Sequence, residues 1–318
     1  MTKPPRWLIA AGLLTIYLIW GSTYLGIRVA VETLPPFLMA GARFLTAGSI
    51  VAILVLMTGK FRATPVLWLW NGAIGCLMLL GGNGFVSWAE QKIPSGIATL
   101  IVSFNPLMIV VAEWMVWRVT RGRMGGKPNW LVFLGLGLGL AGLGLLVGPS
   151  LGSADGGSYD AFRVGALILA CLCWTIGSMM SRYGNKPVDP FTGSAIQMLC
   201  GGVCLTFVGS LLGEWHATDW HAVTGQSVLA WSYLVIAGSL IAFTTFVWLM
   251  NHTSPTLIST YAYVNPIVAV FLGWLVLDEV VDRWTLIAAV IIVAGVASIT
   301  IGKSLKTAKE KPAPAAEE

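Results

Sequence analysis

Hydrophobic residues fill long runs along almost the whole chain, and short gaps that hold prolines, glycines or charges separate these runs. A helix needs about 20 predominantly apolar residues to cross the hydrocarbon core of a membrane. Ten runs have this character, and we expect helices over residues 7–30, 36–58, 67–89, 94–118, 129–148, 163–182, 189–212, 226–250, 255–277 and 284–302. The runs are continuous, whereas the strands of a membrane barrel alternate over about 10 residues. The pattern therefore predicts an all-α polytopic membrane protein with ten transmembrane helices.

The composition agrees with this pattern. Of the 318 residues, 56% are hydrophobic and only 10% are charged, and the mean hydropathy is +0.80. Soluble globular proteins carry about 25% charged residues, so this chain has too few charges to cover a water-soluble surface. The first run is too long for the core of a signal peptide, and we expect it to be a retained helix. Residues 303–318 are rich in Lys, Ala, Pro and Glu and are predicted to form a disordered cytoplasmic tail.

The positive charges divide unequally between the two sets of gaps. With the N-terminus inside, the inner segments hold Lys3, Arg6, Lys60, Arg62, Arg118, Arg121, Arg123, Lys127, Arg182, Lys186, Lys303, Lys306, Lys309 and Lys311. The outer segments hold only Arg28, Lys92, Arg163 and Arg283. Cytoplasmic loops are enriched in Lys and Arg, so we predict a multi-pass protein of the bacterial inner membrane with both termini in the cytoplasm. This placement of the basic residues explains the net charge of +5, so the charge does not indicate a nucleic-acid partner.

The two halves of the chain resemble each other. At an offset of 154 residues the matching positions are Trp20 and Trp174, Arg28 and Arg182, Pro36-Phe37 and Pro190-Phe191, Arg43 and Gln197, and Gly48 and Gly202. At an offset of 160 residues, Asn105-Pro106 and Trp114 match Asn265-Pro266 and Trp274. Each half, 7–148 and 163–302, then has five helices. Because five is odd, the second half enters the membrane in the opposite orientation, which is the inverted repeat of many secondary transporters.

Several short motifs carry a family resemblance. They are Leu18-Ile19-Trp20-Gly21-Ser22, Arg43-Phe44-Leu45-Thr46-Ala47-Gly48, Glu90 to Ala98, the doubled Asn-Pro pair and Asp278-Glu279. In this order the chain resembles the EamA family of the drug/metabolite transporter superfamily over about residues 7–302. The resemblance implies an exporter of amino acids and related metabolites with a central cavity between the halves. Small multidrug-resistance transporters are similar at half the size, but the acid that they carry in their first helix is absent from residues 7–29 and 164–181.

Polar-tipped aromatic residues lie on one face of the first helix. Tyr17, Trp20, Gly21, Tyr24 and Arg28 share this face at about 100° per residue. The face is either a cavity wall that binds an organic substrate or a tightly packed helix interface. The other candidate substrate-binding side chains are Asn83, Trp88, Trp174, Ser178, Trp248 and Tyr263, with Tyr261 and Tyr263 on different faces of the ninth helix.

Two prolines fall near the middle of the fourth and ninth helices. Pro106 and Pro266 each remove one N–H and free a carbonyl four residues back, which makes them candidate hinges. Asn105 and Asn265 beside them offer amides to a polar ligand. The alternative is that each Asn-Pro pair only stabilises a bend between packed helices.

Two charges fall within predicted helices. Arg43 is predicted to meet a substrate carboxylate, to pair with Glu90 or Glu32, or to reach the outer interface. Glu113 near the inner end of the fourth helix is expected to pair with a cytoplasmic-side base such as Arg62 or Arg118, with proton coupling as the alternative.

The remaining residue types exclude several function classes. The five cysteines lie in apolar segments and are interpreted as packing residues, so we expect no disulfide framework, metal or cofactor. The glycines at 135, 137, 139, 142 and 144 are predicted to pack against the tenth helix rather than to bind a nucleotide. The three histidines fall in loops or at helix ends, which disfavours an intramembrane enzyme. The sequence predicts a secondary exporter. The alternatives are a passive channel or lipid flippase on the same fold, or an intramembrane enzyme that acts on lipid head groups. The expected partners are a small-molecule substrate and membrane lipid, and the oligomeric state stays open.

Overall fold

A computed structural model describes residues 4–124, 129–152, 160–184, 189–253, 258 and 261–309, and every regular element in these ranges is helical. The helices of the first half are α1 (Arg6–Ala30), α2 (Pro36–Met57), α3 (Pro65–Gly75), α4 (Phe85–Ala89), α5 (Ser95–Val102), α6 (Asn105–Val119) and α7 (Trp130–Gly152), with the π-helix η1 (Cys76–Gly84) between α3 and α4. The second half contains α8 (Ala161–Tyr183), α9 (Pro190–Leu211), α10 (Glu214–Ala217), η2 (Trp220–Ala222), α11 (Gly225–Tyr233), the π-helix η3 (Leu234–Phe243), α12 (Thr244–His252), α14 (Tyr261–Leu277) and α15 (Arg283–Lys309). The predicted all-α class is confirmed.

Seven of the described helical segments are long and apolar enough to cross a membrane, and three shorter apolar helices lie at 130–145, 264–277 and 283–295. All ten occupy positions that the hydrophobic runs predict. Large apolar side chains point outward, among them Leu69 at 78% and Phe162 at 76% exposure. A surface of this kind is suited to lipid rather than to water.

Capping residues explain where several helices begin. Thr64 accepts a hydrogen bond from the Leu67 amide at 3.3 Å, and Asp189 accepts one from the Thr192 amide at 3.0 Å. In both cases a proline follows at the first helical position, where no N–H is needed. The breakers that mark the predicted gaps therefore also start the helices.

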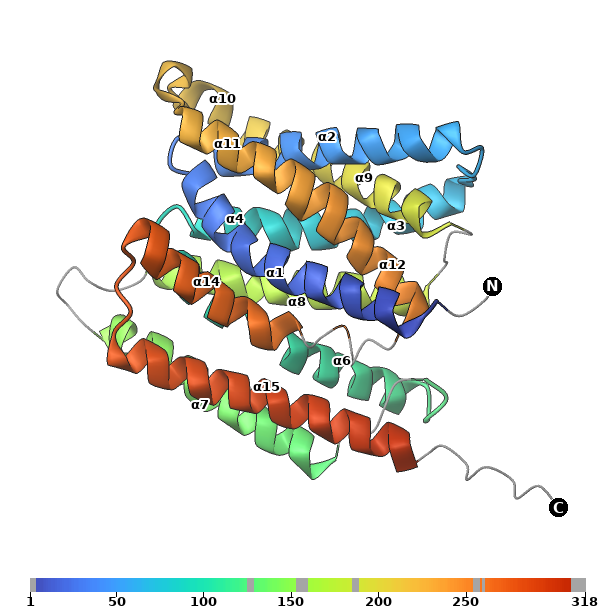
Figure 1. The fold of residues 1–318 in the computed structure, drawn as a ribbon, viewed down its shortest axis with the longest axis vertical. Coiled ribbons are helices and arrows are strands. Elements are labelled where there is room, and N and C mark those ends of the chain that lie inside the picture. Colours follow the sequence, from blue (N-terminus) through green and yellow to red (C-terminus); the bar gives the residue numbers. More distant parts are fainter. Residues whose placement is uncertain are drawn as a thin grey trace.

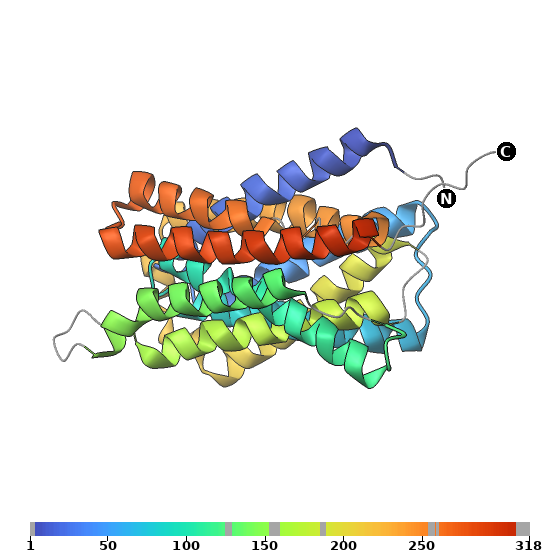
Figure 2. The ribbon, with the colours of Figure 1, turned by 90° about the horizontal axis from the view of Figure 1, so that it is seen from below.

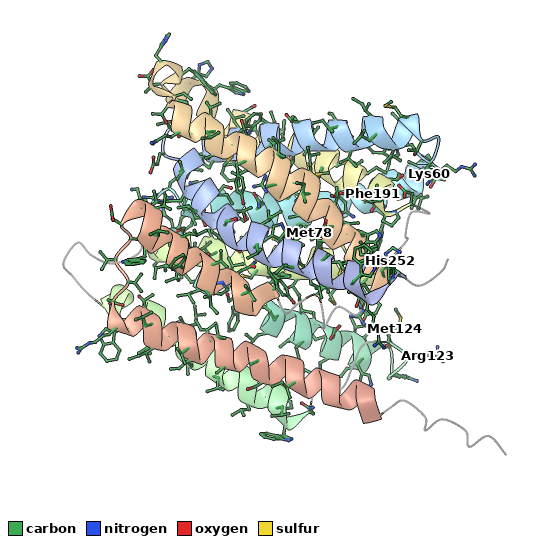
Figure 3. All side chains as sticks on the ribbon, viewed as in Figure 1. Lys60, Met78, Arg123, Met124, Phe191 and His252 are labelled. Carbon is green, nitrogen blue, oxygen red and sulfur yellow. The ribbon has the colours of Figure 1, made fainter. Side chains whose placement is uncertain are left out.

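The long helices run roughly along one direction, and α1 begins and α15 ends at the same end of the bundle (Figures 1 and 2). We call this the terminal end, and the other the opposite end. Lys60 and Arg123 lie at the terminal end, while Met78 lies in the interior (Figure 3).

Two pairs of equivalent helices, one helix from each half, pack along each other: α2 with α9, and α7 with α15. Small residues permit this approach. A Cβ atom on Gly295 would lie 2.8 Å from the carbonyl oxygen of Gly135, so these backbones are in direct contact. The predicted packing of the glycine-rich fifth helix on the tenth is present in the structure.

The structure corrects three details of the predicted helices. The fourth segment is broken at Ser103 and Phe104, so Pro106 lies in the first turn of α6 rather than inside a helix, whereas Pro266 is inside α14. The third and eighth segments contain π-helices, which hydrophobic periodicity does not reveal. Finally, α15 continues to Lys309, so residues 303–309 are helical rather than part of a disordered tail.

Candidate functional site

A cavity of about 80 Å³ lies within the bundle, between elements of both halves. Its lining residues are Trp20, Thr23, Tyr24, Ile27, Arg43, Phe44, Leu79, Gly82, Asn83, Val86, Val102, Asn105, Ala170, Cys171, Trp174, Gly238, Phe243, Tyr261 and Asn265. Pockets for drug-sized ligands measure roughly 300–1,000 Å³. In this conformation the cavity has room for only a small polar molecule or a few water molecules.

Both π-helices supply residues to the cavity wall. Gly82 and Asn83 come from η1, and Gly238 and Phe243 come from η3. A π-helix has wider turns than an α-helix and occurs frequently at functional sites. The two segments occupy corresponding places in the third and eighth apolar segments, so each half contributes one irregular helix to the same cavity.

Arg43 is the charged side chain of the cavity wall. It is 3% exposed, and its Nε donates to the Ser239 hydroxyl at 2.8 Å. The guanidinium carbon lies 4.7 Å from the centre of the Phe44 ring. Its Nη1 is buried without a hydrogen-bond partner in the described part of the chain. A buried donor of this kind is costly unless it is satisfied, so Nη1 can receive an acceptor group of a bound molecule.

Three asparagine amides line the same cavity, and they differ in what they already bind. The Asn83 Oδ1 atom is buried and lacks a hydrogen-bond partner among the described residues. Asn105 accepts a hydrogen bond from the Thr175 hydroxyl at 2.8 Å. Asn265, with its amide nitrogen turned toward α1, donates to the carbonyls of Tyr261 and Tyr17 at 3.1 Å each. Asn83 therefore offers the acceptor that is not already engaged, while Asn265 also holds α14 against α1.

Aromatic rings form one side of the cavity. Trp20 meets Trp174 edge to face with a centroid distance of 5.8 Å, and it meets Tyr261 in the same manner at 5.2 Å. Trp20, Trp174 and Tyr261 come from α1, α8 and α14. The rings provide an apolar and polarisable surface beside the polar groups of Arg43 and Asn83.

The structure brings together seven of the predicted binding residues at the cavity: Trp20, Tyr24, Arg43, Asn83, Asn105, Trp174 and Asn265. Their role in binding stays a prediction. Arg43 bonds to Ser239 rather than to Glu90 or Glu32, and its burial excludes an exposed position at the interface.

Four predicted residues lie away from the cavity wall. Tyr17 packs in an apolar cluster, and the Ser178 hydroxyl is buried elsewhere. Trp88 stacks with Arg163, whose guanidinium lies 4.3 Å from its ring centre, and Trp248 stacks with His252 at 4.5 Å. The side chain of Tyr263 lies outside the described residues.

Thr23 and Tyr261 line the cavity in addition to the predicted binding residues. Thr23 lies three residues after Trp20, which puts it on the same helical face. Tyr261 and Tyr263 lie on different faces of one helix, and the sequence alone does not choose between these two faces.

Polar contacts join the halves near both ends of the bundle. At the terminal end, Arg182 pairs with Glu113 at 2.8 Å, so Glu113 has a basic partner from the inner set, as expected, although Arg182 is not one of the two arginines named as examples. At the opposite end, Glu214 accepts the amides of Phe37 and Leu38 at 3.2 and 2.8 Å. Burial raises the pKa of Glu214, and these two amides lower it in part.

The Glu279 carboxylate makes a similar contact at the opposite end. It accepts hydrogen bonds from the Ser95 amide and hydroxyl and from the Gly96 amide, at 2.8 to 3.2 Å. Two acids of the second half therefore cap two helices of the first half. Within the described residues no group of three His, Cys, Asp or Glu is placed to hold a metal ion.

The chain matches the EamA-like transporter family twice, over residues 7–148 and 162–301. It is 37% identical over 304 residues to the uncharacterized inner membrane transporter YedA of Escherichia coli (strain K12), which covers 95% of this chain and 94% of that protein. It is also 24% identical to the uncharacterized transporter YoaV of Bacillus subtilis (strain 168), with 91% and 95% covered, and 28% identical to the protein PecM of Dickeya dadantii, with 86% of each covered.

A crystal structure of a protein with 22% sequence identity matches this chain with a TM-score of 0.66, covering 95% of this chain and 100% of the other. This likeness shows a shared fold. The two family matches span most of the sequence, and the YedA relative exceeds 30% identity over nearly full length. The chain accordingly belongs to the EamA-like transporter family and is a membrane transporter rather than an enzyme.

Proposed function

We propose that this protein is a secondary transporter of a bacterial inner membrane that exports amino acids or related small carboxylates by alternating access. The observation that carries the proposal is the cavity between the halves, in which the buried Nη1 of Arg43 has no hydrogen-bond partner in the described chain. A carboxylate is a strong acceptor for guanidinium. Trp20 and Trp174 form the apolar part of the site, where a substrate side chain would lie.

The proposed architecture is ten spans in two inverted five-helix repeats, 7–148 and 163–302. Three observations support it. The family matches the chain once in each half, a π-helix occurs in the third and in the eighth apolar segment, and α1 begins where α15 ends (Figure 1). We assign the terminal end, with Lys60 and Arg123 (Figure 3), to the cytoplasm because inner loops are rich in basic residues. The inner-membrane location of the YedA relative supports the same membrane here.

Purified protein in liposomes tests the proposal. Labelled amino acids should cross these membranes with saturating kinetics, and Trp20→Ala and Asn83→Ala should lose most of the flux while they remain folded. Trp130→Ala is the matched control, because Trp130 is 70% exposed on α7 and does not line the cavity. Failure of a panel of amino acids to cross faster than in empty liposomes would contradict the proposed substrate class. Flux that rises in proportion to concentration without saturation would point to a channel.

A further inference from the structure

A buried carboxyl group lies near the contacts that join the halves at the opposite end of the bundle. Glu90 follows α4 and is 0% exposed. Neither of its carboxylate oxygens has a hydrogen-bond partner among the described residues. Its neighbours along the chain, Ala89 and Ile93, are equally buried and apolar. An ionised carboxylate is unfavourable in such a place unless it is paired and hydrogen-bonded.

The charged and titratable groups around Glu90 come from three other elements. Arg28 of α1 donates to the main-chain carbonyl of Glu90 rather than to its carboxylate, and its charge attracts that carboxylate. Glu279, between α14 and α15, repels it. Tyr24 of α1 interacts electrostatically with Glu90. Arg163 of α8 donates a hydrogen bond to the main-chain carbonyl of Trp88, which lies two residues before Glu90. The attraction between Arg28 and the Glu90 carboxylate is thus opposed by repulsion from Glu279.

Glu279 is held in this position by a contact between the two halves. Its carboxylate accepts the amides of Ser95 and Gly96 at the start of α5. The fit is close, because a Cβ atom on Gly273 would overlap Oε2 of Glu279. When α5 and Glu279 are docked, Glu90 is therefore buried near a second carboxylate, which the amides at the start of α5 hold in place. Separating them would relieve that repulsion.

From this geometry we propose that Glu90 is a proton-binding site and that the outer end of the transporter closes only when Glu90 is protonated. The inference rests on the proposed function, in which the opposite end faces outward and opens during transport. When that end is open, water reaches the carboxylate, and the proton comes from the external solution. The neutral carboxyl can then be buried beside the docked Glu279. External protons would therefore be required for the transporter to return from its outward-open state.

Hydrogen exchange at the amides of Ser95 and Gly96 tests this inference without knowledge of the substrate. The full-length protein in nanodiscs is followed by mass spectrometry across pH 5 to 9, and exchange rates are expressed relative to those of an unstructured peptide at the same pH. If closure requires one proton, protection of residues 90–104 should fall by about tenfold per pH unit above the midpoint. Glu90→Gln mimics the neutral acid and should keep these amides protected across the whole range. Protection in the wild-type protein that does not change with pH would overturn the proposal, whether or not the variant folds.

Two further variants separate proton binding from the general loss of a closing contact. Glu214→Gln changes the equivalent carboxylate that caps α2, so residues 90–104 should keep their wild-type pH dependence. Glu279→Gln removes the repulsion that Glu90 meets in the docked state, so protection should fall by a smaller factor from low to high pH than in the wild-type protein, whatever its level at low pH. A wild-type pH dependence that survives in Glu90→Gln would show that another group binds the proton and would contradict the proposal.

The flux assay provides the functional counterpart. With an established substrate, raising the external pH should slow transport by the wild-type protein and leave Glu90→Gln unaffected. An absence of amino-acid flux would count against the proposed function alone, because the exchange measurement on Glu90 needs no substrate. Identical pH profiles for the two proteins would count against Glu90 alone.

Discussion

Arg43 of α2 donates its Nε hydrogen to the hydroxyl of Ser239 on η3 at 2.8 Å. This bond joins a helix of the first half to the π-helix of the second half. It also fixes the plane of the guanidinium, so that Nη1 stays beside the cavity without a partner among the described residues. The position that the sequence singles out as an intramembrane charge is therefore supplied by one half and oriented by the other.

Removal of the Arg43 charge should weaken the binding of a carboxylate substrate. A hydrogen bond to a charged group contributes about 1.5–3 kcal/mol, so Arg43→Gln should raise KM for flux by about 10- to 100-fold. Arg43→Lys should recover only part of this, because a lysine cannot bond to Ser239 and to a carboxylate in the same fork geometry. Arg62→Gln, at an exposed arginine, is the control. An unchanged KM in Arg43→Gln would show that Arg43 does not bind the substrate carboxylate.

Close helix contacts predict a large difference between two glycines. A Cβ atom on Gly75 would overlap the carbonyl oxygen of Gln197, whereas nothing lies within 4 Å of one on Gly137. Gly75→Ala should therefore lower stability by about 1–3 kcal/mol or more, because backbone rather than a flexible side chain must move. Gly137→Ala should be neutral. Thermal unfolding in detergent measures both variants, and equal melting temperatures would contradict the close approach of α3 to α9.

The ion pair between Glu113 and Arg182 should couple α6 to α8. Nη1 of Arg182 lies 2.8 Å from Oε1 of Glu113, and the side chains of Glu113 and Arg182 are 12% and 32% exposed, respectively. Glu113→Gln and Arg182→Gln should each reduce stability, and the double variant should be less affected than the sum of the two. The expected coupling energy is about 0.5–3 kcal/mol. Strict additivity in a double-mutant cycle would show that the pair does not stabilise the terminal end.

The sequence predicts a structural feature well wherever a residue type strongly favours one local structure or environment. Long apolar runs locate the helical segments, and prolines such as Pro36 and Pro190 mark where helices begin. Trp20 and Trp174, which match across the halves, both reach the cavity because each lies on the inner face of an equivalent helix. These features depend on local chemistry and on the repeat, which are both visible in one chain.

The features that the sequence does not predict depend on how the helices are rotated and docked. Trp88 and Trp248 resemble cavity aromatics in sequence, yet they stack with Arg163 and His252 away from the cavity. Glu113 has basic residues nearer in sequence, but α8 brings Arg182 to it across the interface. The π-turns of η1 and η3 have no hydrophobic period that separates them from an α-helix. Tertiary packing decides each of these.

The pH dependence of Glu214 gives a prediction for a site outside the spanning helices. Burial raises the pKa of this carboxyl in the folded protein. A raised folded pKa means that its contribution to stability is fully present below the unfolded value, about 4.3, and is lost as the pH rises through the folded pKa. Glutamine at this position does not titrate and keeps an oxygen for the amides of Phe37 and Leu38.

The melting temperature of the wild-type protein should therefore fall relative to that of Glu214→Gln as the pH rises above the pKa of an unfolded glutamate, about 4.3. Asp282 supplies the opposite control, because its hydrogen bond from the Thr285 amide at 2.7 Å lowers its pKa. Its contribution to stability is present above the unfolded value and is lost as the pH falls through the folded pKa. Asp282→Asn should therefore melt at a lower temperature than the wild-type protein at neutral pH, and this difference should shrink at acid pH. Melting curves of the three proteins from pH 3 to 8 measure both effects. If the wild-type protein instead gained stability over Glu214→Gln with rising pH, the hydrogen bonds from α2 would outweigh the burial of the charge.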